Sequence, residues 1–170
     1  MADLELPKNG VIWDIGAGCG SIGLEALKLR PNLDLFCIDK RIGSKALILE
    51  NSKRLGVKPK FICEDDINNI LNTKNLSPFE KPNRLVIGGC DKKTKLQIIK
   101  KLATGMSIGD IIVIPIIDIQ TIKELKEELE DKNFKTNLNL IQTYKSLSIA
   151  GGMRLEPYNP VFLLKAKKEI

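Results

Sequence analysis

The sequence predicts an α/β fold, with a mostly parallel seven-stranded sheet, helices on both faces and an antiparallel hairpin at the C-terminal edge. Three observations support this prediction. Apolar runs alternate with helical patterns through the first 130 or so residues, as in chains built from βαβ units. The runs are continuously apolar, as expected for strands buried on both faces. Beyond residue 135 apolar and polar residues alternate, which is typical of antiparallel strands.

Each element follows from a particular stretch of the chain. Five apolar runs are expected to form buried strands, at residues 10–16, 33–39, 58–65, 83–89 and 110–117. Helices are expected at residues 20–30, 41–55 and 67–71, in a lysine-rich segment ending near residue 103, and at 119–132. Gly56 is expected to close the second helix and Asp118 to cap the last one. Segments 135–149 and 160–167 are expected to pair as the hairpin, joined by residues 150–159.

Composition limits the chemistry. The chain has 170 residues, and we expect residues 1–170 to form a single domain. It has no histidine, so serine–histidine and cysteine–histidine nucleophile systems cannot be built from it. The four cysteines form no C-x-x-C pair, which favours reduced thiols and gives no reason to expect a metal site. The N-terminus has no signal pattern and no apolar run approaches about 20 residues, so we expect a cytoplasmic protein without a membrane span.

A glycine-rich loop follows the first predicted strand. It reads Gly16-Ala17-Gly18-Cys19-Gly20-Ser21, and Asp14 stands two residues before the first glycine. A dinucleotide-binding fingerprint, G-x-G-x-x-G, would place its third glycine one residue later. The pattern D-x-G-x-G-x-G is instead typical of Rossmann-like class I methyltransferases that use S-adenosylmethionine (SAM). In that interpretation Asp14 suits the amino group of SAM, and the bare backbone lets the ligand lie against the loop.

Acidic residues at the ends of the next strands support the same ligand. Asp39 ends the second strand about 20 residues beyond the loop, where a carboxylate can accept both ribose hydroxyls. Asp65 or Asp66, at the end of the third strand, is expected to meet the adenine amino group. A glycine-rich turn without a ligand, and a helix-capping role for Asp39, remain as alternatives. The predicted SAM-binding residues are Asp14, Gly16, Ala17, Gly18, Gly20, Ser21, Asp39, Lys40, Asp65, Asp66 and Gly88.

Three segments resemble one family in particular. "WDIGAGCGSIGLEAL", "NRLVIGGC" and "NPVFLLKAKK" are similar, in this order, to the methyltransferase half of precorrin-6Y C5,15-methyltransferase (decarboxylating), a family of cobalamin biosynthesis. The resemblance runs from about residue 10 to residue 168. It implies methylation of a precorrin at carbon 15, coupled to decarboxylation of the ring acetate at carbon 12. It also implies a tetrapyrrole-methylase domain for carbon 5, fused or separate, and homotetramers occur among relatives.

The chain departs from this family in three places. Relatives usually carry a helix before the first strand, and "MADLELPKNG" is too short to hold it. We therefore expect the chain to be one half of a longer or two-subunit enzyme. The loop after the fourth strand reads Gly88-Gly89-Cys90-Asp91-Lys92 instead of Gly-Gly-Ser-Gly-Gly, and the fifth strand ends in "IPIIDIQT". These last two departures concern the substrate more than the cofactor.

Substrate contacts are expected near the fourth strand and in the hairpin. Gly88 and Gly89 would let a flat macrocycle approach the methyl group. Cationic side chains would pair with the many carboxylates of a precorrin, although for each single lysine or arginine plain surface charge is the favoured explanation. The predicted substrate-binding residues are Gly89, Cys90, Lys92 and Arg154. Methyl transfer chiefly demands alignment, and no residue is assigned a catalytic role.

Two other functions fit parts of the sequence. The net charge of +6 suits a SAM-dependent RNA methyltransferase. The lysine-rich segment 92–101 contains no aromatic residue to stack on bases, so nucleic acid is not the expected partner. The other alternative is a SAM-binding module without its own activity, which serves as partner to the carbon-5 methylase domain.

The glycine loop gives a direct test of the cofactor assignment. Gly18→Val should abolish SAM binding, measured by calorimetry, because the branched side chain would fill the space that the ligand needs. The circular dichroism spectrum should show that the variant is still folded. An unchanged affinity for SAM would contradict the assignment of this loop.

Overall fold

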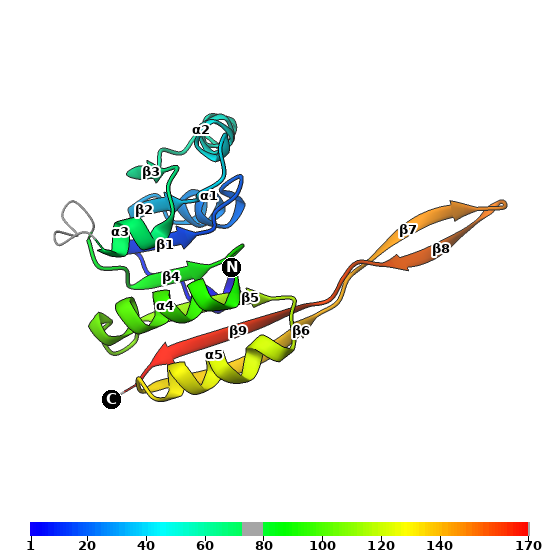
Figure 1. The fold of residues 1–170 in the computed structure, drawn as a ribbon. Helices are drawn as coiled ribbons and strands as arrows, with labels where there is room; N and C mark the ends of the chain where they lie inside the picture. The colour runs from blue at the N-terminus through cyan, green and yellow to red at the C-terminus, as the bar shows by residue number, and fades with distance from the viewer. Residues whose placement is uncertain (73–79, 170) are drawn as a thin grey trace.

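The main sheet contains seven strands in the computed structural model, which describes residues 1–72 and 80–169 (Figure 1). The strand order is β3-β2-β1-β4-β5-β9-β6. Strands β1 to β5 pair in parallel, and β9 runs antiparallel to both β5 and β6. The strands are β1 Gly10–Ile15, β2 Leu33–Ile38, β3 Phe61–Cys63, β4 Arg84–Ile87, β5 Ile111–Ile116, β6 Phe134–Ile141 and β9 Val161–Lys168.

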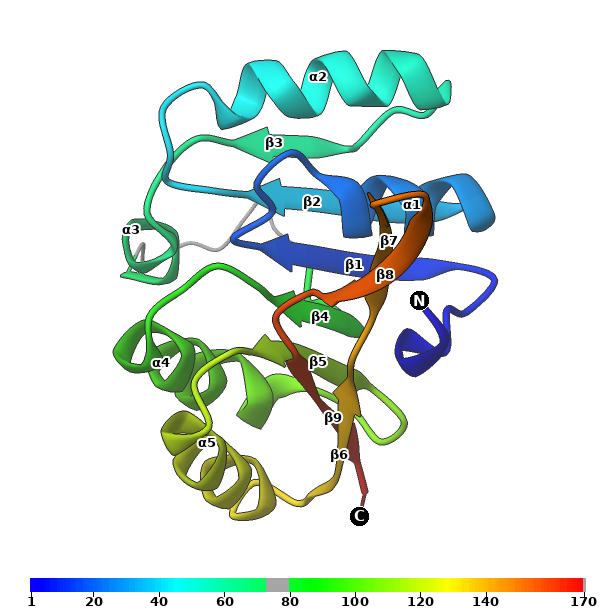
Figure 2. The same ribbon diagram turned by 90° about the vertical axis from the view of Figure 1, so that its right-hand side faces the viewer.

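Helices cover both faces of this sheet (Figure 2). The α-helices are α1 Ser21–Leu29, α2 Ser44–Leu55, α3 Ile67–Asn72, α4 Lys92–Leu102 and α5 Gln120–Glu130. Two short 3₁₀ turns, η1 Ala2–Leu4 and η2 Ala103–Gly105, complete the set. Gly56 ends α2 with a φ of 67°, as predicted. Asp118 also acts as predicted: its carboxylate accepts the N–H of Gln120, the first residue of α5.

Side chains of the sheet alternate between two apolar layers, as the pleat of a strand requires. Trp13 and Ile15 of β1 belong to the layer that α3, α4 and α5 cover. Ile12, between them and buried, belongs to the layer that α1 and α2 cover. By the same alternation Asp14 faces α1 and α2. The central strands are therefore buried on both faces, which explains their continuously apolar sequence.

The predicted hairpin forms, but with a different boundary. The segment expected as one strand, residues 135–149, divides into β6 and a separate strand, β7 Tyr144–Ile149. The segment expected as a connecting loop, residues 150–159, contains β8 Gly152–Pro157, which pairs with β7. Ala150 and Gly151 both have positive φ, as the tight turn between two such strands requires. Strands β7 and β8 form a two-stranded ribbon that projects from the body (Figure 1).

The sheet topology positions a site at one edge. The strand order changes direction between β1 and β4: β2 and β3 extend the sheet on one side of β1, and β4 and β5 extend it on the other. Ligands of open α/β sheets bind at such a point, outside the carboxyl ends of the strands. The loops after β1, β2, β3 and β4 all leave from this edge. Strand β6 ends at the same edge, because it and β5 both run antiparallel to β9, and the ribbon continues outward from there.

Candidate functional site

The loops after β1 and β4 touch each other through backbone alone. The Gly88 N–H donates to the carbonyl of Ile15 at 2.7 Å. Gly16 has a φ of 71°, and a Cβ built there would lie only 2.6 Å from the backbone nitrogen of Gly89. Any other residue at position 16 would push the two loops apart. At Gly16 the absence of a side chain therefore permits a close contact between two loops.

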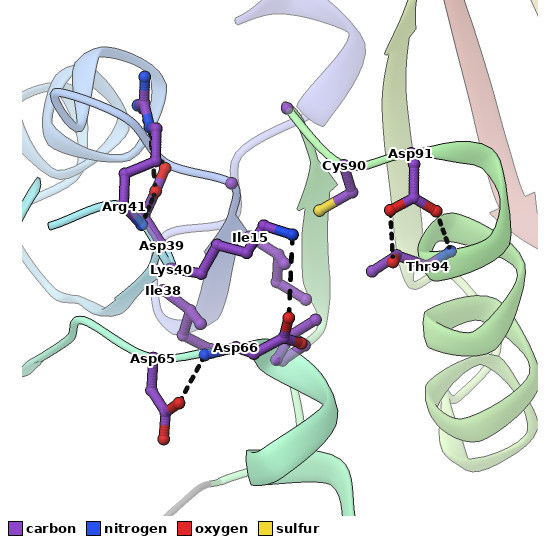
Figure 3. A pocket seen from close by; sticks show the side chains of 13 residues that line it. Ile15, Ile38, Asp39, Lys40, Arg41, Asp65, Asp66, Cys90, Asp91 and Thr94 are labelled. Atoms are coloured by element: carbon purple, nitrogen blue, oxygen red, sulfur yellow. Dashed lines mark hydrogen bonds and ion pairs between the residues drawn. The ribbon is translucent and has the colours of Figure 1, made fainter.

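A cavity of roughly 230 Å³ lies beside this contact (Figure 3). It opens between the loops after β1 and β4 on one side and those after β2 and β3 on the other. Its lining residues are Ile15, Gly16, Ile38, Asp39, Lys40, Arg41, Asp65, Asp66, Ile67, Gly89, Cys90, Asp91 and Thr94. Seven of the residues predicted to bind cofactor or substrate are among them: Gly16, Asp39, Lys40, Asp65, Asp66, Gly89 and Cys90.

Asp39 is the most strongly held carboxylate of the cavity. It is 5% exposed and accepts the Gly18 N–H at 2.7 Å and the Arg41 N–H at 2.9 Å. The Arg41 guanidinium adds two further hydrogen bonds, at 3.1 and 3.3 Å. Burial raises the pKa of Asp39, but these hydrogen bonds outweigh it and hold the pKa below its ordinary value. Asp39 is thus an ionised acceptor that also fixes the glycine loop.

The acids after β3 line the opposite wall. The Asp65 carboxylate accepts the backbone N–H of Asp66 and the side-chain amide of Asn69. Asp66 accepts the N–H of Asn68, at the start of α3, and lies 3.9 Å from the ammonium of Lys40. Both residues line the cavity, but only the Asp66 carboxylate turns toward Lys40, whereas that of Asp65 points away from the cavity (Figure 3). Both carboxylates also support the helix that follows.

The lining suits a nucleoside-like ligand without phosphates. Asp39, Asp65 and Asp66 offer acceptors for hydroxyl and amino groups, while Ile15, Ile38 and Ile67 offer an apolar surface for a ring. Carboxylates outnumber cations along the wall, which opposes a phosphate and favours a ligand with positive charge. Gly16 keeps its wall free of a Cβ where the ligand would pass. The residues present therefore fit the cofactor that the sequence predicts.

Asp14 has a different environment from the one expected. It is 2% exposed, lies outside the cavity lining, and accepts the N–H of Gly23 in α1 at 2.9 Å. A Cβ at Gly23 would lie 3.0 Å from the Asp14 carboxylate, so the glycine allows this approach. The structure thus assigns Asp14 to the junction between β1 and α1. Trp13 and Ile15 face the layer under α3, α4 and α5, so the pleat of β1 turns Asp14, which lies between them, toward α1.

A second hollow, of roughly 470 Å³, adjoins the cavity. The two share Gly89, Cys90 and Asp91, so the loop after β4 is the wall between them. The hollow extends to the end of β5 and the start of β9. Its lining residues are Gly88, Gly89, Cys90, Asp91, Lys92, Lys95, Pro115, Ile116, Ile117, Asp118, Thr121 and Val161. Lys92, predicted to bind substrate, lies here and pairs with Glu124 at 2.8 Å.

The remaining predicted residues lie elsewhere. Gly18 positions the loop through its bond to Asp39. Ala17 donates to the carbonyl of Ile38, and Gly20 precedes α1 with a φ of 80°. Ser21 faces a separate hollow on the α1 side of the sheet.

Arg154, predicted to bind substrate, lines neither hollow. It lies in β8 of the projecting ribbon, and its partner is Glu156 at 3.9 Å. Residues 150–159, expected as the connection of the hairpin, instead contain β8, which carries Arg154 away from both hollows.

Several lining residues were not predicted. Arg41 lies two residues after Asp39 in the chain and contacts it, so this pair is visible in the sequence. Asp91 caps α4 by accepting the N–H and the hydroxyl of Thr94, and an Asp three residues before a Thr at a helix start is also a visible signal. Lys95 and the apolar residues of β5 carry no local signal, because only the tertiary fold brings them to the hollow.

Neither a metal cluster nor a membrane-spanning helix is present among the described residues. Within residues 1–72 and 80–169, no group of three or more cysteine, aspartate or glutamate side chains is arranged to hold a metal ion. Across the same ranges, no helix has the length and apolar character needed to cross a bilayer.

Comparison with known proteins identifies relatives over nearly the whole chain. Residues 1–168 match the model of the precorrin methyltransferase domain family. A protein of Saccharolobus solfataricus, named cobalt-precorrin-6B C(15)-methyltransferase (decarboxylating), is 29% identical over 177 residues, which cover 99% of this chain and 83% of the relative.

Solved structures share the fold. Precorrin-6Y C5,15-methyltransferase from Geobacter metallireducens superposes with a TM-score of 0.83 at 25% identity, covering 99% of this chain and 84% of that one. Precorrin 8W decarboxylase from Methanobacterium thermoautotrophicum also gives a TM-score of 0.83, at 23% identity, covering 98% and 86%. The predicted Rossmann-like class I methyltransferase fold, with its antiparallel C-terminal edge, is confirmed.

The buried carboxyl of Asp14 predicts a pH effect on stability. Burial, supported by the negative charge of Asp39, raises the pKa of Asp14 from 3.8 to about 6, although the Gly23 N–H opposes the shift. The folded state therefore binds a proton more tightly than the unfolded state, and this stabilising contribution is complete below pH 3.8 and lost as pH rises to about 6. Relative to Asp14→Asn, the wild-type free energy of unfolding should fall by about 1–3 kcal/mol between pH 4 and pH 7.

Urea unfolding of the two proteins at pH 4, 5, 6 and 7 measures this difference. Asp131→Asn serves as the control, because Asp131 is exposed. Parallel pH profiles for wild type and Asp14→Asn would contradict the raised pKa.

Proposed function

This chain belongs to the precorrin methyltransferase domain family, and from that premise we propose that it transfers a methyl group from SAM to carbon 15 of a precorrin. Decarboxylation of the ring acetate at carbon 12 accompanies the transfer. The observation that carries the proposal is the pair of adjoining hollows, one suited to a nucleoside and one large enough for part of a macrocycle. The loop after β4 borders both hollows through Gly89, Cys90 and Asp91. The name of the relative from Saccharolobus solfataricus describes the same reaction.

SAM would occupy the cavity between the loops after β1, β2, β3 and β4. When bound, SAM supplies an electrophilic methyl group on a sulfonium. Asp39 is positioned to accept hydrogen bonds from the ribose hydroxyls, and Ile38 and Ile67 to pack against the adenine ring. Gly16 and Gly89 leave the passage toward the second hollow free of side chains.

The chain's own residues contribute alignment and exclusion of water. A precorrin meso carbon is an enamine-type nucleophile, so no protein base is required at the attacking atom. The electrons released with carbon dioxide can enter the imine system of the ring. Cys90 lies on the shared wall, and burial raises the pKa of its thiol, which keeps it a neutral packing group. Alignment of this kind can supply a large part of the rate enhancement of a displacement reaction.

The alternatives find less support. An RNA methyltransferase needs an extended basic surface, whereas Lys92, Lys100 and Lys132 each pair with a glutamate of α5. A SAM-binding module without activity would need the cavity but not the second hollow. We expect a carbon-5 methylase domain as partner, fused or separate, because the Geobacter relative is named as a C5,15-methyltransferase.

An assay of both products tests the function. The protein is incubated with SAM and precorrin-6B, or its cobalt form, with and without the carbon-5 methylase, while methylation and carbon dioxide release are followed. Both products are expected from the chain alone. Binding of SAM without either product would favour the module, and methylation of RNA alone would overturn the proposal.

A matched pair of variants ties this activity to the cavity. Asp39→Ala should raise the KM for SAM at least tenfold, because about two hydrogen bonds to a charged acceptor are lost. Asp34→Ala removes a carboxylate from the same strand far from the cavity, where it pairs with Lys60, and should leave the KM unchanged. Equal effects of the two variants would contradict the role of Asp39.

We also propose that the ribbon mediates self-association, as homotetramers occur in this family. One face of the ribbon is apolar and exposed, and its partner would be a second copy of this chain. Exposed apolar residues of this face are Tyr144, Met153 and Leu155, and the register places them on one side. The other face carries Lys145, Arg154 and Glu156, which pair with one another. A two-stranded ribbon is marginally stable in isolation, which favours a covered state.

Light scattering after size-exclusion chromatography tests the assembly. The double variant Met153→Asp/Leu155→Asp should lower the molecular mass from that of an oligomer toward that of one chain, while Arg154→Ser on the opposite face should not. A monomeric wild type, or an oligomer that the double variant leaves intact, would contradict this proposal.

A further inference from the structure

Lys95 differs from the other cations near the two hollows. Lys92 pairs with Glu124 at 2.8 Å, Lys40 lies 3.9 Å from Asp66, and Arg41 is bonded to Asp39. Lys95 also lines the second hollow, but it forms no ion pair with a carboxylate in the part of the chain that the structure describes. Its ammonium donates to the carbonyl of Cys90 at 2.6 Å.

The ammonium of Lys95 therefore retains unused capacity. An ammonium has three donors, and the bond to Cys90 uses one. The side chain is half-buried, so its charge is less well hydrated than that of a surface lysine. Burial lowers the pKa of Lys95, while nearby Asp91 opposes the shift. An anion that entered the hollow would compensate the Lys95 ammonium for the hydration that it loses on burial.

The two carboxylates that line the same hollow do not neutralise the charge of Lys95. The Asp91 carboxylate accepts the N–H and the hydroxyl of Thr94, which places its charge against the N-terminus of α4. Asp118 does the same at α5, through the N–H of Gln120 and the hydroxyl of Thr121. Both negative charges are offset by helix N-termini. The free charge of the hollow is accordingly positive and is centred on Lys95.

The opposite side of the hollow is apolar. Pro115, Ile116, Ile117 and Val161 form it. A ligand that suits this hollow has an apolar body and carries an anionic group at its margin. A flat ring system with carboxylate side chains meets both requirements.

We propose that Lys95 binds a carboxylate side chain of the tetrapyrrole substrate and thereby sets the position of the ring against the loop after β4. This inference rests on the proposed function and replaces Lys92 by Lys95 as the lysine that contacts substrate. Because the same ammonium holds the carbonyl of Cys90, one side chain links the bound carboxylate to the wall that faces the methyl donor. Lys92 instead holds α4 to α5 through Glu124.

Binding of uroporphyrin, a stable tetrapyrrole with eight carboxylates, tests the assignment. Its affinity is measured by fluorescence in the presence of S-adenosylhomocysteine for wild type, Lys95→Met, Lys95→Arg and Lys92→Met. Lys95→Met should bind about tenfold more weakly, because a charge-assisted hydrogen bond is lost. Lys95→Arg should stay within about threefold of wild type, since it keeps the charge, and so should Lys92→Met.

Two further readouts separate substrate contact from a structural effect. The affinity for S-adenosylhomocysteine, measured by calorimetry, should be the same in Lys95→Met and wild type if the loop after β4 keeps its place. Raising the salt concentration should weaken uroporphyrin binding less in Lys95→Met than in wild type, because one screened attraction is missing.

The outcomes distinguish the inference from the function on which it rests. Wild-type binding that Lys95→Met leaves intact, or that Lys92→Met weakens equally, would overturn the role of Lys95 alone. Loss of S-adenosylhomocysteine affinity in Lys95→Met to the same extent as uroporphyrin affinity would also overturn it, in favour of a structural role. A wild type that binds S-adenosylhomocysteine but not uroporphyrin would contradict the tetrapyrrole function and Lys95 with it.

Discussion

The contact between the backbones of Gly16 and Gly88–Gly89 is the constraint on which the site depends. It joins the loops after β1 and β4 at the point where strand order reverses, and a single Cβ at Gly16 would break it. The loop held by this contact lines a hollow on each of its two sides through Gly89, Cys90 and Asp91, so the contact fixes how the two hollows lie relative to each other. Strands on either side of the reversal supply the remaining walls.

The carboxylates at this edge of the sheet each serve the fold as well as the site. Asp39 holds Gly18, Asp66 holds the start of α3, and Asp91 and Asp118 hold the starts of α4 and α5. At Asp91 and Asp118 the negative charge lies against a helix N-terminus, so the second hollow is less acidic toward a ligand than its composition indicates. An anionic substrate can therefore approach an edge rich in aspartate.

Much of the fold was predictable from the sequence because the central strands are buried on both faces. Their apolar runs are continuous, and Asp39 and Asp65 follow directly after strands, where parallel topology gathers side chains. The same continuity concealed the environment of Asp14, since a run that is apolar throughout does not show which layer each residue faces. The glycine at position 23, inside a helix, was a signal that some group approaches there closely. It was not used.

The ribbon and the second hollow could not be predicted in the same way. The alternation of residues 135–149 is interrupted only briefly, at residues 140–143. Hydrogen bonds from Gln142 and Tyr158 cross the base of the ribbon there, between β6 and β7. Lys95 reaches the hollow only because α4 packs beside β5. Features of this kind arise from tertiary contacts between segments far apart in sequence.

The position of β9 has a consequence for how the chain folds. This strand follows β5 and β6 in the chain but lies between them in the sheet, and it forms the backbone hydrogen bonds that join each of them to the sheet at that edge. Until it is inserted, β5 and β6 both expose unpaired edges, and α5 has only part of the surface against which it packs. Closing the sheet therefore joins residues about 50 positions apart in sequence, a non-local step of the kind that slows folding. During synthesis the half from β1 to β4, whose loops line the cavity, can assemble first, while the half of the sheet beyond β4 must wait for β9.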